Sequence, residues 1–403
     1  MNYALLIGSY NGQDSLGDKG LLKAVSSQIA KRFNGDFGVV CHVANIEEGF
    51  NPGTAVLRRG IWQCTSACAS KTHVFSRWPL LHLMMTYALI PVWLLSARKN
   101  RDIWRSFKAD CKEAEFLYFY GGTQLSSQWF WLNMPSILIT ILMVRRFDHP
   151  VFFGPQQYGP LDDRQRGFLL RVISWFVEGV RTRSSLCQKA LGLLPEQLTL
   201  DEIFSCADCI PVEDPADQSD YILVNFRGSN FLQDDFPDGA LRFVEIVAGL
   251  SRKWMCGVKV VQMSGSSFCD DKGILGLIAN AGVDVELIPH THDERDVYLW
   301  ARNAKACVAM SFHACVLTLM AGKPAIPVTS GRYYDYKYVD FDRYTGGQGV
   351  PVIDLETKLP AEWITEIDSF VAKFSGVQVI ETRRVAGSLV DRWYDTVCGQ
   401  EIL

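Results

Sequence analysis

One stretch in the C-terminal half of the chain constrains the fold more than any other. Residues 308–328 read VAMSFHACVLTLMAGKPAIPV. The apolar run 306–310 predicts a strand, and residues 314–320 predict a helix that Gly322 ends. The apolar run 325–328 predicts the next strand. A strand, a helix and a second strand in this order form a βαβ unit, which needs a parallel sheet with helices packed on its faces.

The same alternation of short apolar runs and longer amphipathic segments occurs along most of the chain. The predicted strands are 3–7, 38–43, 115–120, 151–153, 177–180, 221–225, 258–262, 285–288, 306–310 and 325–328. The predicted helices are 21–33, 78–97, 164–176, 238–254, 272–281, 295–303, 314–320, 361–374 and 388–397. Residues 51–63 are expected to form a loop and a helix, and residues 331–347 a loop rich in tyrosine. The alternation predicts an α/β protein with two doubly wound sheets.

The chain is long for one domain. At 403 residues it is expected to hold two domains of about 200 residues each. The segment 195–220 is polar and broken by prolines, and its last part is the predicted linker. We expect Rossmann-like domains over 1–210 and 218–378 that face each other across a cleft, as in the glycosyltransferase-B fold. Residues 379–403 are expected to form a helix that packs back on the N-terminal domain.

Composition excludes several classes of protein. The net charge is −4 and the sequence pI is about 6.0, so nothing predicts a nucleic-acid partner. The chain starts as MNYALLIGSYNG, without the regions of a secretory signal, and we expect a cytoplasmic protein with reduced cysteines. Cys206 and Cys209 form a CxxC pair, and Cys64 and Cys68 a CxxxC pair. We expect no cofactor and no metal, and a structural zinc that unites both pairs is the alternative.

Residues 78–97 form the most apolar segment, WPLLHLMMTYALIPVWLLSA. The basic residues that follow it are Arg98, Lys99, Arg101, Arg105 and Lys108. Its length is close to the roughly 20 residues that a spanning helix needs, but His82 and Pro91 interrupt it. Three interpretations stay open: a helix on a membrane surface with the basic residues at lipid headgroups, a buried or dimer-interface helix, and a membrane-spanning helix.

Polar residues lie where predicted strands end. Ser311 and His313 follow the strand 306–310 at a helix N-terminus, where N–H groups favour an anion, and ligands of open α/β sheets gather at this edge. A histidine beside an anion site is a candidate for proton transfer near neutral pH. The alternative is a histidine that caps or packs at the helix start. The Gly-rich loop 8–20 before the helix 21–33 also favours an anion, although a plain βα turn would look similar.

Several short motifs carry a family resemblance. They are Gly17-Asp18, Gly121-Gly122-Thr123, Gly154 to Leu161, Val180-Arg181 with Leu191-Gly192, Asn225-Phe226-Arg227, and Phe312-His313-Ala314 with Ala321 to Pro324. In this order and spacing the chain resembles the polysaccharide pyruvyl transferase family, from near residue 4 to near residue 337. The resemblance implies a glycosyltransferase-B fold and transfer from phosphoenolpyruvate to a sugar, usually as a pyruvate ketal on two hydroxyls.

The resemblance assigns roles residue by residue, and this chain departs from it at several positions. The family histidine corresponds to His313, but Ser311 stands where the family typically has arginine. The first loop has Ser15 where asparagine is usual and Lys19 where an acidic residue is common. Some family members have a small residue and an aromatic before the histidine, and a Tyr-rich segment with a lysine after the next strand. Residues 333–337, YYDYK, resemble that segment.

The implied chemistry needs cations and a proton donor. Phosphoenolpyruvate carries about three negative charges, which arginine binds best. The candidate cations are Arg181, Arg227, Arg332 and Lys337. His313 is the expected acid, which protonates the enol methylene while a sugar hydroxyl attacks the next carbon; a second hydroxyl then displaces phosphate. Asp18 is expected to accept a hydroxyl proton or to cap its helix, and Arg181 to bind a ligand or to form a structural salt bridge. The other expected substrate-binding residues are Gly17, Gly122, Ser311, Phe312 and Tyr334.

Two other functions stay open. A glycosyltransferase that uses a nucleotide-sugar donor has the same architecture, and Ser311 in place of arginine favours it. A non-catalytic protein of this fold that binds a sugar or a partner is the second. For the transferase, the partners are phosphoenolpyruvate and a sugar acceptor. The acceptor is expected on a lipid carrier at the inner face of the membrane, where polysaccharide repeat units are commonly built.

Overall fold

The chain folds into two compact units, which are described separately. The computed structural model describes residues 3–8, 15–33, 38–43, 54–59, 68, 79–122, 125–127, 129–205, 221–227, 238–264, 273–289, 291, 293–330 and 332–399. The N-terminal unit comprises residues 1–13, 21–203 and 389–403. The C-terminal unit comprises residues 14–20 and 204–388. The start of the first helix therefore belongs to the C-terminal unit.

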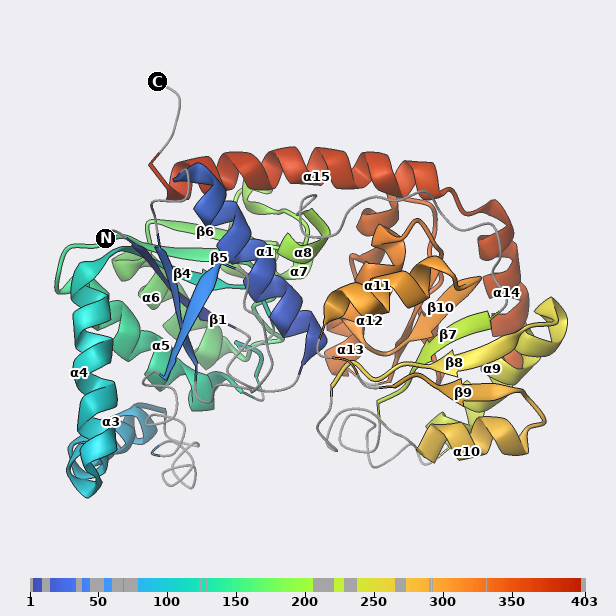
Figure 1. Ribbon diagram of the computed structural model, residues 1–403, viewed down its shortest axis with the longest axis horizontal. Helices are drawn as coiled ribbons and strands as arrows, with labels where there is room; N and C mark the ends of the chain where they lie inside the picture. Colours follow the sequence, from blue (N-terminus) through green and yellow to red (C-terminus); the bar gives the residue numbers. More distant parts are fainter. Residues whose placement is uncertain are drawn as a thin grey trace. The chain divides into compact units, whose positions relative to one another are not determined.

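A parallel sheet of six strands forms the centre of the N-terminal unit (Figure 1). Its strands are β1 (Tyr3–Gly8), β2 (Gly38–Val43), β3 (Ala55–Arg59), β4 (Ala114–Tyr120), β5 (Val151–Gln156) and β6 (Gly179–Thr182). They lie in the order β3-β2-β1-β4-β5-β6, and each neighbouring pair is parallel. β1 and β5 are buried along their whole length, as a sheet with helices on both faces requires.

Helices surround this sheet. They are α1 (Leu16–Arg32), α3 (Pro79–Ser96), α4 (Arg98–Glu113), α5 (Phe130–Arg145), α6 (Asp163–Phe176), α7 (Ser185–Leu191), the 3₁₀ turn η2 (Pro195–Gln197) and α8 (Glu202–Ser205). A buried carboxylate fixes α4 to the sheet. Asp110 accepts hydrogen bonds from the Tyr3 hydroxyl at 3.1 Å and from His42 Nε2 at 2.8 Å, and the Arg58 guanidinium contacts it as well.

One prediction for this unit is wrong. Residues 51–63 were expected to form a loop and a helix, whereas Ala55–Arg59 form β3, parallel to β2 at the edge of the sheet. Five residues that include two arginines carry too little periodicity to identify a strand. Pairing with β2 and the contact between Arg58 and Asp110 decide the conformation, and both depend on residues distant in sequence.

A second parallel sheet of six strands forms the centre of the C-terminal unit (Figure 1). Its strands are β7 (Tyr221–Asn225), β8 (Gly257–Val260), β9 (Val285–Leu287), β10 (Ala306–Ala309), β11 (Ala325–Thr329) and β12 (Ile353–Asp354). They lie in the order β12-β11-β10-β7-β8-β9, and each neighbouring pair is parallel. The central strand β10 is fully buried, as its apolar sequence predicts.

The helices of this unit include two elements that the sequence did not predict. The helices are α9 (Gly239–Trp254), α10 (Gly273–Asn280), α11 (Glu294–Arg302), α12 (Phe312–Met320), α13 (Arg332–Tyr338), the 3₁₀ turn η4 (Phe341–Thr345), α14 (Pro360–Lys373) and α15 (Gly376–Val397). Residues 331–347 were expected to form a loop, but they contain α13 and η4. Tyr334, Tyr338, Phe341 and Tyr344 recur at spacings of three and four, and their buried rings contact one another.

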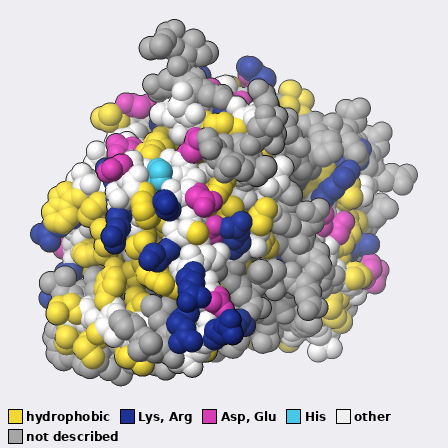
Figure 2. Space-filling model, turned by 60° about the vertical axis from the view of Figure 1, so that its left-hand side comes forward, with side chains coloured by type: hydrophobic (Ala, Val, Ile, Leu, Met, Phe, Trp, Pro, Cys, Tyr) yellow, Lys and Arg dark blue, Asp and Glu magenta, His cyan; other side chains and the backbone are white. Residues whose placement is uncertain are grey.

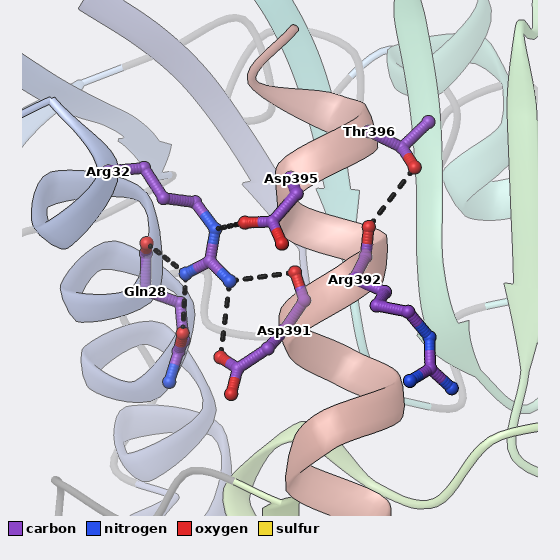
Figure 3. Close-up of polar contacts among 6 residues, drawn as sticks. All are labelled: Gln28, Arg32, Asp391, Arg392, Asp395 and Thr396. Carbon is purple, nitrogen blue, oxygen red and sulfur yellow. Dashed lines mark hydrogen bonds and ion pairs between the residues drawn. The ribbon is translucent and has the colours of Figure 1, made fainter. Parts of the chain in front are cut away.

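The end of α15 belongs to the N-terminal unit, where α1 holds it (Figure 3). Arg32 of α1 donates from Nε to the Asp395 carboxylate at 2.8 Å. Its Nη2 donates to the backbone carbonyl of Asp391 at 2.7 Å and to the Asp391 carboxylate at 3.1 Å. Its Nη1 donates to Gln28 one turn earlier in α1, while Arg392 points away in Figure 3. One arginine of α1 thus bonds to two residues of α15 that lie one turn apart.

In both sheets, the strand order shows where a ligand is expected to bind. In each sheet, the first three strands are added in one direction and the next three in the other. The direction therefore reverses between β1 and β4 in the first sheet and between β7 and β10 in the second. Ligands of open α/β sheets bind outside the carboxyl ends of the strands at such a reversal. The ends of β4, β7 and β10 are therefore the positions to examine for chemistry.

Two further findings concern membranes and metals. Within the part of the chain that the structure describes, no helix is both long and apolar enough to cross a membrane. The described cysteines are free thiols, and no group of three or more potential metal ligands occurs among the described residues. Cys64, Cys206 and Cys209, which the sequence paired into possible zinc ligands, lie outside the described residues.

Candidate functional site

An asparagine joins the two central strands of the C-terminal unit at their carboxyl ends. Asn225 is the last residue of β7 and is fully buried. Its Oδ1 accepts a hydrogen bond from the backbone N–H of Ser311 at 3.1 Å, and its Nδ2 donates to the Val261 carbonyl at 3.0 Å. The amide side chain thus fixes the segment that follows β10 against the ends of β7 and β8.

The start of α12 lies directly beyond this connection. Ser311 is the N-cap residue, but its side chain makes no capping hydrogen bond. The helix begins at Phe312, two residues earlier than the sequence predicted, so His313 lies in its first turn. The N-terminus of this nine-residue helix carries a partial positive charge and favours an anion. Ser311, Phe312 and His313 therefore occupy the edge at which a ligand is expected.

The first turn of α1 packs directly on the His313 ring. A β-carbon built on Gly17 would lie 1.9 Å from His313 Nδ1, so only glycine fits at this position. Hydrogen bonding fixes this turn in the C-terminal unit: the backbone N–H of Leu16 donates to the Met263 carbonyl at 2.9 Å, and Ser15 forms an antiparallel bridge with Ser264. The structure thereby brings Gly17 to the histidine, and Asp18 is the next residue of the same turn.

An aromatic cluster holds a lysine at the same edge. The Phe312 ring lies 5.8 Å from the Tyr338 ring and 5.7 Å from the Tyr344 ring. Lys337 Nζ lies 5.7 Å from the centroid of Phe312 and 6.0 Å from that of Tyr334. At these distances the two rings attract the ammonium group and fix its position. Lys337, Phe312 and Tyr334, three candidate substrate-binding residues, are thus together.

Arg227 follows β7 by two residues and is half-buried. Its backbone N–H donates to Met310 Sδ at 3.5 Å, and the Met310 carbonyl accepts from the Tyr338 hydroxyl at 2.9 Å. Burial raises the pKa of Tyr338 well above its ordinary value, and the nearby charge of Arg227 acts in the opposite direction. Arg227 thus adds positive charge to the group of residues around Phe312. The side chain of Arg332 is not among those that the structure describes.

Two predicted site residues belong to the N-terminal unit. Gly122 follows β4 with φ of 119°, a conformation that favours glycine, and its carbonyl accepts from the Gln157 N–H at 3.2 Å. Arg181 in β6 donates to the Glu196 carbonyl, and its guanidinium lies 5.0 Å from the centroid of the Trp393 ring. Burial lowers the pKa of Arg181. These contacts give Arg181 a role in holding α15, whereas the position of Gly122 at a strand end suits a ligand.

A pocket elsewhere in the C-terminal unit does not coincide with this site. It has a volume of about 660 Å³ and lies between α14 and the loop before β12. The residues that line it are Gln348, Gly349, Pro351, Ala361, Glu362, Thr365, Glu366, Ser369, Phe370 and Lys373. None of the residues around His313 contributes to it. The strand-end cluster is the candidate site, because it combines an imidazole, cations and a helix N-terminus.

Residues 203–332 match the model of one protein family. The matched family is polysaccharide pyruvyl transferase. The match covers Asn225, Arg227 and the 311–313 segment, and it therefore includes the reversal point of the second sheet. It supports a transferase that modifies polysaccharides. No curated protein matches the sequence.

Solved structures with the same fold cover nearly the whole chain. A co-structure of S. aureus MnaA with UDP has a TM-score of 0.57 at 8% identity and covers 99% of this chain and 97% of its own. A putative UDP-N-acetylglucosamine 2-epimerase from Listeria monocytogenes has a TM-score of 0.55 at 8% identity, with 98% and 95% covered. The glycotransferase of kitacinnamycin has a TM-score of 0.51 at 12% identity, with 99% and 98% covered. These neighbours show a two-domain fold of the glycosyltransferase-B type.

Sequence reasoning did not select Asn225, which the structure places at the site, and it did not predict the burial of Lys19. Asn225 was noted only as part of a motif, although a polar amide at the end of a buried strand is a signal for a positioning role. Lys19 was noted as a departure from the family, and the structure buries it completely in the first turn of α1. The apolar residues that follow it at 21–22 are the only local sign that this lysine faces the interior.

Proposed function

We propose that the protein transfers the pyruvate group of phosphoenolpyruvate to a sugar of a saccharide, forming a ketal and releasing phosphate. The observation that carries the proposal is the grouping of His313, Lys337 and Arg227 around the N-terminus of α12, at the reversal point of the sheet. The family match over the same segment supports it. The donor is thus assigned to the C-terminal unit.

The proposed donor site offers three sources of positive potential. The start of α12 supplies backbone N–H groups, and Lys337 and Arg227 supply full charges. Phosphoenolpyruvate carries about three negative charges, so it needs such a set. Ser311 occupies the position of the family arginine, and in the proposal the two cations on neighbouring elements replace its charge.

The proposed reaction proceeds in two steps. In the first, a sugar hydroxyl oxygen bonds to C2 of the donor, the enol π electrons take a proton from His313 to form a methyl group, and Asp18 accepts the hydroxyl proton. In the second, another hydroxyl of the same sugar bonds to C2 while the bond from C2 to the phosphate oxygen breaks. Phosphate leaves with the bonding electrons, and the second hydroxyl proton returns to His313. This use of one imidazole as acid and then base is ordinary general catalysis.

The acceptor is assigned to the N-terminal unit, with Gly122 at the end of β4 as its candidate contact. In the proposal the acceptor saccharide is carried on a lipid at the inner face of the membrane, and the protein is cytoplasmic.

The proposal is tested by incubating purified protein with phosphoenolpyruvate and a panel of sugar acceptors while phosphate release is followed. Phosphate that appears only with an acceptor, together with a saccharide heavier by one pyruvate ketal, supports the proposal. Phosphate release without a modified saccharide, or no release with any acceptor, contradicts it. A glycosyltransferase that uses a nucleotide sugar is the second candidate, because Ser311 removes a donor-binding arginine. That activity would release a nucleoside diphosphate instead.

A further inference from the structure

Two consecutive helices of the N-terminal unit present an unusual outer surface. α3 ends at Ser96 and α4 begins at Arg98, so a single residue separates them. The two helices contact each other, and both contact α5. α4 is in turn fixed to the sheet through Asp110. The two helices are therefore packed on the rest of the unit, and this packing determines which of their side chains face outward.

The outer side of α3 carries an apolar stripe. Leu81, Met84, Met85 and Val92 are 39%, 68%, 37% and 61% exposed, and Ala88 is exposed as well. Spacings of three and four residues place all five on one side of the helix. On the opposite side, Thr86 and Ile90 are buried. The helix therefore packs its polar threonine inward and leaves methionines and valine in contact with water, which is unfavourable unless something covers them.

The outer side of α4 carries a basic stripe. Ile103 and Phe107 face the interior, while the exposed basic residues are Arg98, Lys99, Arg101, Arg105, Lys108 and Lys112. The exposed acidic residues of the helix are Asp102, which pairs with Arg105 at 3.1 Å, and Glu113. Figure 2 shows hydrophobic atoms and a group of Lys and Arg side chains side by side on this face. The surface thus joins uncovered apolar area to a large excess of positive charge.

We propose that the α3–α4 surface binds an anionic lipid bilayer, with the α3 stripe in the headgroup and acyl boundary and the α4 stripe on the lipid phosphates. Apolar area next to clustered basic residues is the combination that anionic membrane surfaces attract. A second copy of this chain is the less suitable occupant, because two α3–α4 surfaces would bring their basic stripes together and repel. The buried side of α3 packs on the unit, so the helix lies along the bilayer surface.

The experiment measures binding of the full-length protein to vesicles. One set contains phosphatidylcholine alone, and the other contains equal parts of phosphatidylcholine and phosphatidylglycerol. The basic variant is Arg101→Ser/Lys108→Ser/Lys112→Ser, and the apolar variant is Met84→Ser/Val92→Ser. The structure describes no side-chain ion pair for the three basic residues, and all five positions are exposed, so both variants should fold. Matched controls in the C-terminal unit are Arg252→Ser/Lys373→Ser/Arg384→Ser and Met255→Ser/Val377→Ser, which are exposed too.

The parent is expected to bind the anionic vesicles at least about 10-fold more tightly than the neutral ones, and less tightly at high salt. The basic variant is expected to lose about 100-fold in affinity for anionic vesicles, the apolar variant to bind both sets more weakly, and the controls to match the parent. Equal binding of parent and basic variant, or no binding by the parent, overturns the proposal. A parent dimer that the apolar variant dissociates, without vesicle binding, also overturns it.

The inference does not depend on the proposed transfer reaction. Pyruvyl transfer to a water-soluble acceptor is measured on the same variants, and it should be unchanged, because none of the substituted residues lies among the candidate site residues. Normal transfer without vesicle binding would contradict only the proposed docking surface. Normal vesicle binding without transfer would contradict only the proposed reaction.

Discussion

At the level of single residues, Gly17 packs against His313 in the candidate site, with no room for a β-carbon between them. The two positions are far apart in sequence, but the hydrogen bond from Leu16 to Met263 holds the start of α1 in the C-terminal unit. A methyl group on residue 17 would overlap His313 Nδ1 and Cγ, at 1.9 Å and 2.3 Å. The His313 ring can therefore keep its orientation only because residue 17 has no side chain.

The substitution Gly17→Ala is expected to displace the imidazole. It should reduce the rate of transfer by at least about 10-fold, and overpacking should lower the free energy of unfolding by about 1–3 kcal/mol. Initial rates and urea unfolding measure the two effects. The control is Gly276→Ala in α10, where nothing lies near the added methyl group and a helical alanine should stabilise. Unchanged activity of Gly17→Ala would argue against a positioned His313.

His313 itself is predicted to transfer protons. His313→Gln keeps a planar polar side chain of similar size but removes the titrating group, so the rate should fall about 100-fold or more while phosphoenolpyruvate still binds. Steady-state kinetics with a donor titration separate the two quantities. His149→Gln, next to the end of α5 in the other unit, should behave as the parent. A loss confined to KM would assign His313 to binding instead.

At the level of elements, a buried glutamate joins α8 to β4 and to the end of α15. Glu202 Oε1 accepts from the hydroxyls of Tyr118 and Tyr394, both at 2.6 Å, and the Trp393 indole donates to Tyr118 at 2.9 Å. Burial raises the pKa of Glu202 to about 7, although the hydrogen bonds from both tyrosines act against this rise. The network lies behind the Gly121-Gly122 turn, since the Gly121 N–H also points to this carboxyl group at 3.4 Å.

The raised pKa predicts a dependence of stability on pH. The folded state holds the Glu202 proton up to about pH 7, whereas the unfolded chain loses it near pH 4.5. The contribution of Glu202 to the free energy of unfolding is complete below the pKa of the unfolded chain and is lost as the pH rises through the pKa of the folded state. Its size is limited to about 3 kcal/mol. Urea unfolding of the parent and of Glu202→Gln at about pH 5 and about pH 8 should show a larger decrease for the parent. Equal decreases would contradict the assignment of this pH dependence to Glu202.

The elements also show where sequence patterns are sufficient. The strand Tyr221–Asn225 was predicted with its observed bounds, because a continuous apolar run in a buried parallel strand needs no distant information. The 331–347 segment was predicted as a loop rich in tyrosine, whereas it contains α13 and η4. Its aromatic residues do recur at spacings of three and four, but their packing against Phe312 involves a distant segment of the chain.

At the level of the whole molecule, the two sheets have the same strand order. The repeated alternation of strands and helices predicted two doubly wound sheets but not the order of their strands. What the sequence did not predict is the assignment of 14–20 to the C-terminal unit. That assignment depends on contacts with residues distant in sequence, such as the hydrogen bond from Leu16 to Met263 and the bridge between Ser15 and Ser264. The predicted domain limits of 1–210, 218–378 and 379–403 stay a prediction.

In the candidate site, too, local features could be predicted from the sequence and long-range packing could not. Ser311, Phe312 and His313 could be predicted because a strand end and a helix start are local features. Their grouping with Lys337 follows from the packing of α13, and their grouping with Gly17 from the placement of α1, so neither could be derived from spacing. The family match from 203 to 332 likewise stops before Lys337 and does not reach Gly17.

The central claim is that the C-terminal unit binds a small, highly charged donor beside His313. Calorimetric titration of phosphoenolpyruvate into the parent, Arg227→Gln, Lys337→Gln and the control Arg252→Gln tests it most directly. The account predicts that each of the first two variants raises the Kd by about 10-fold or more, because each removes one charge-assisted contact, while the control matches the parent. The same Kd for all four proteins, or no binding by the parent, would contradict it.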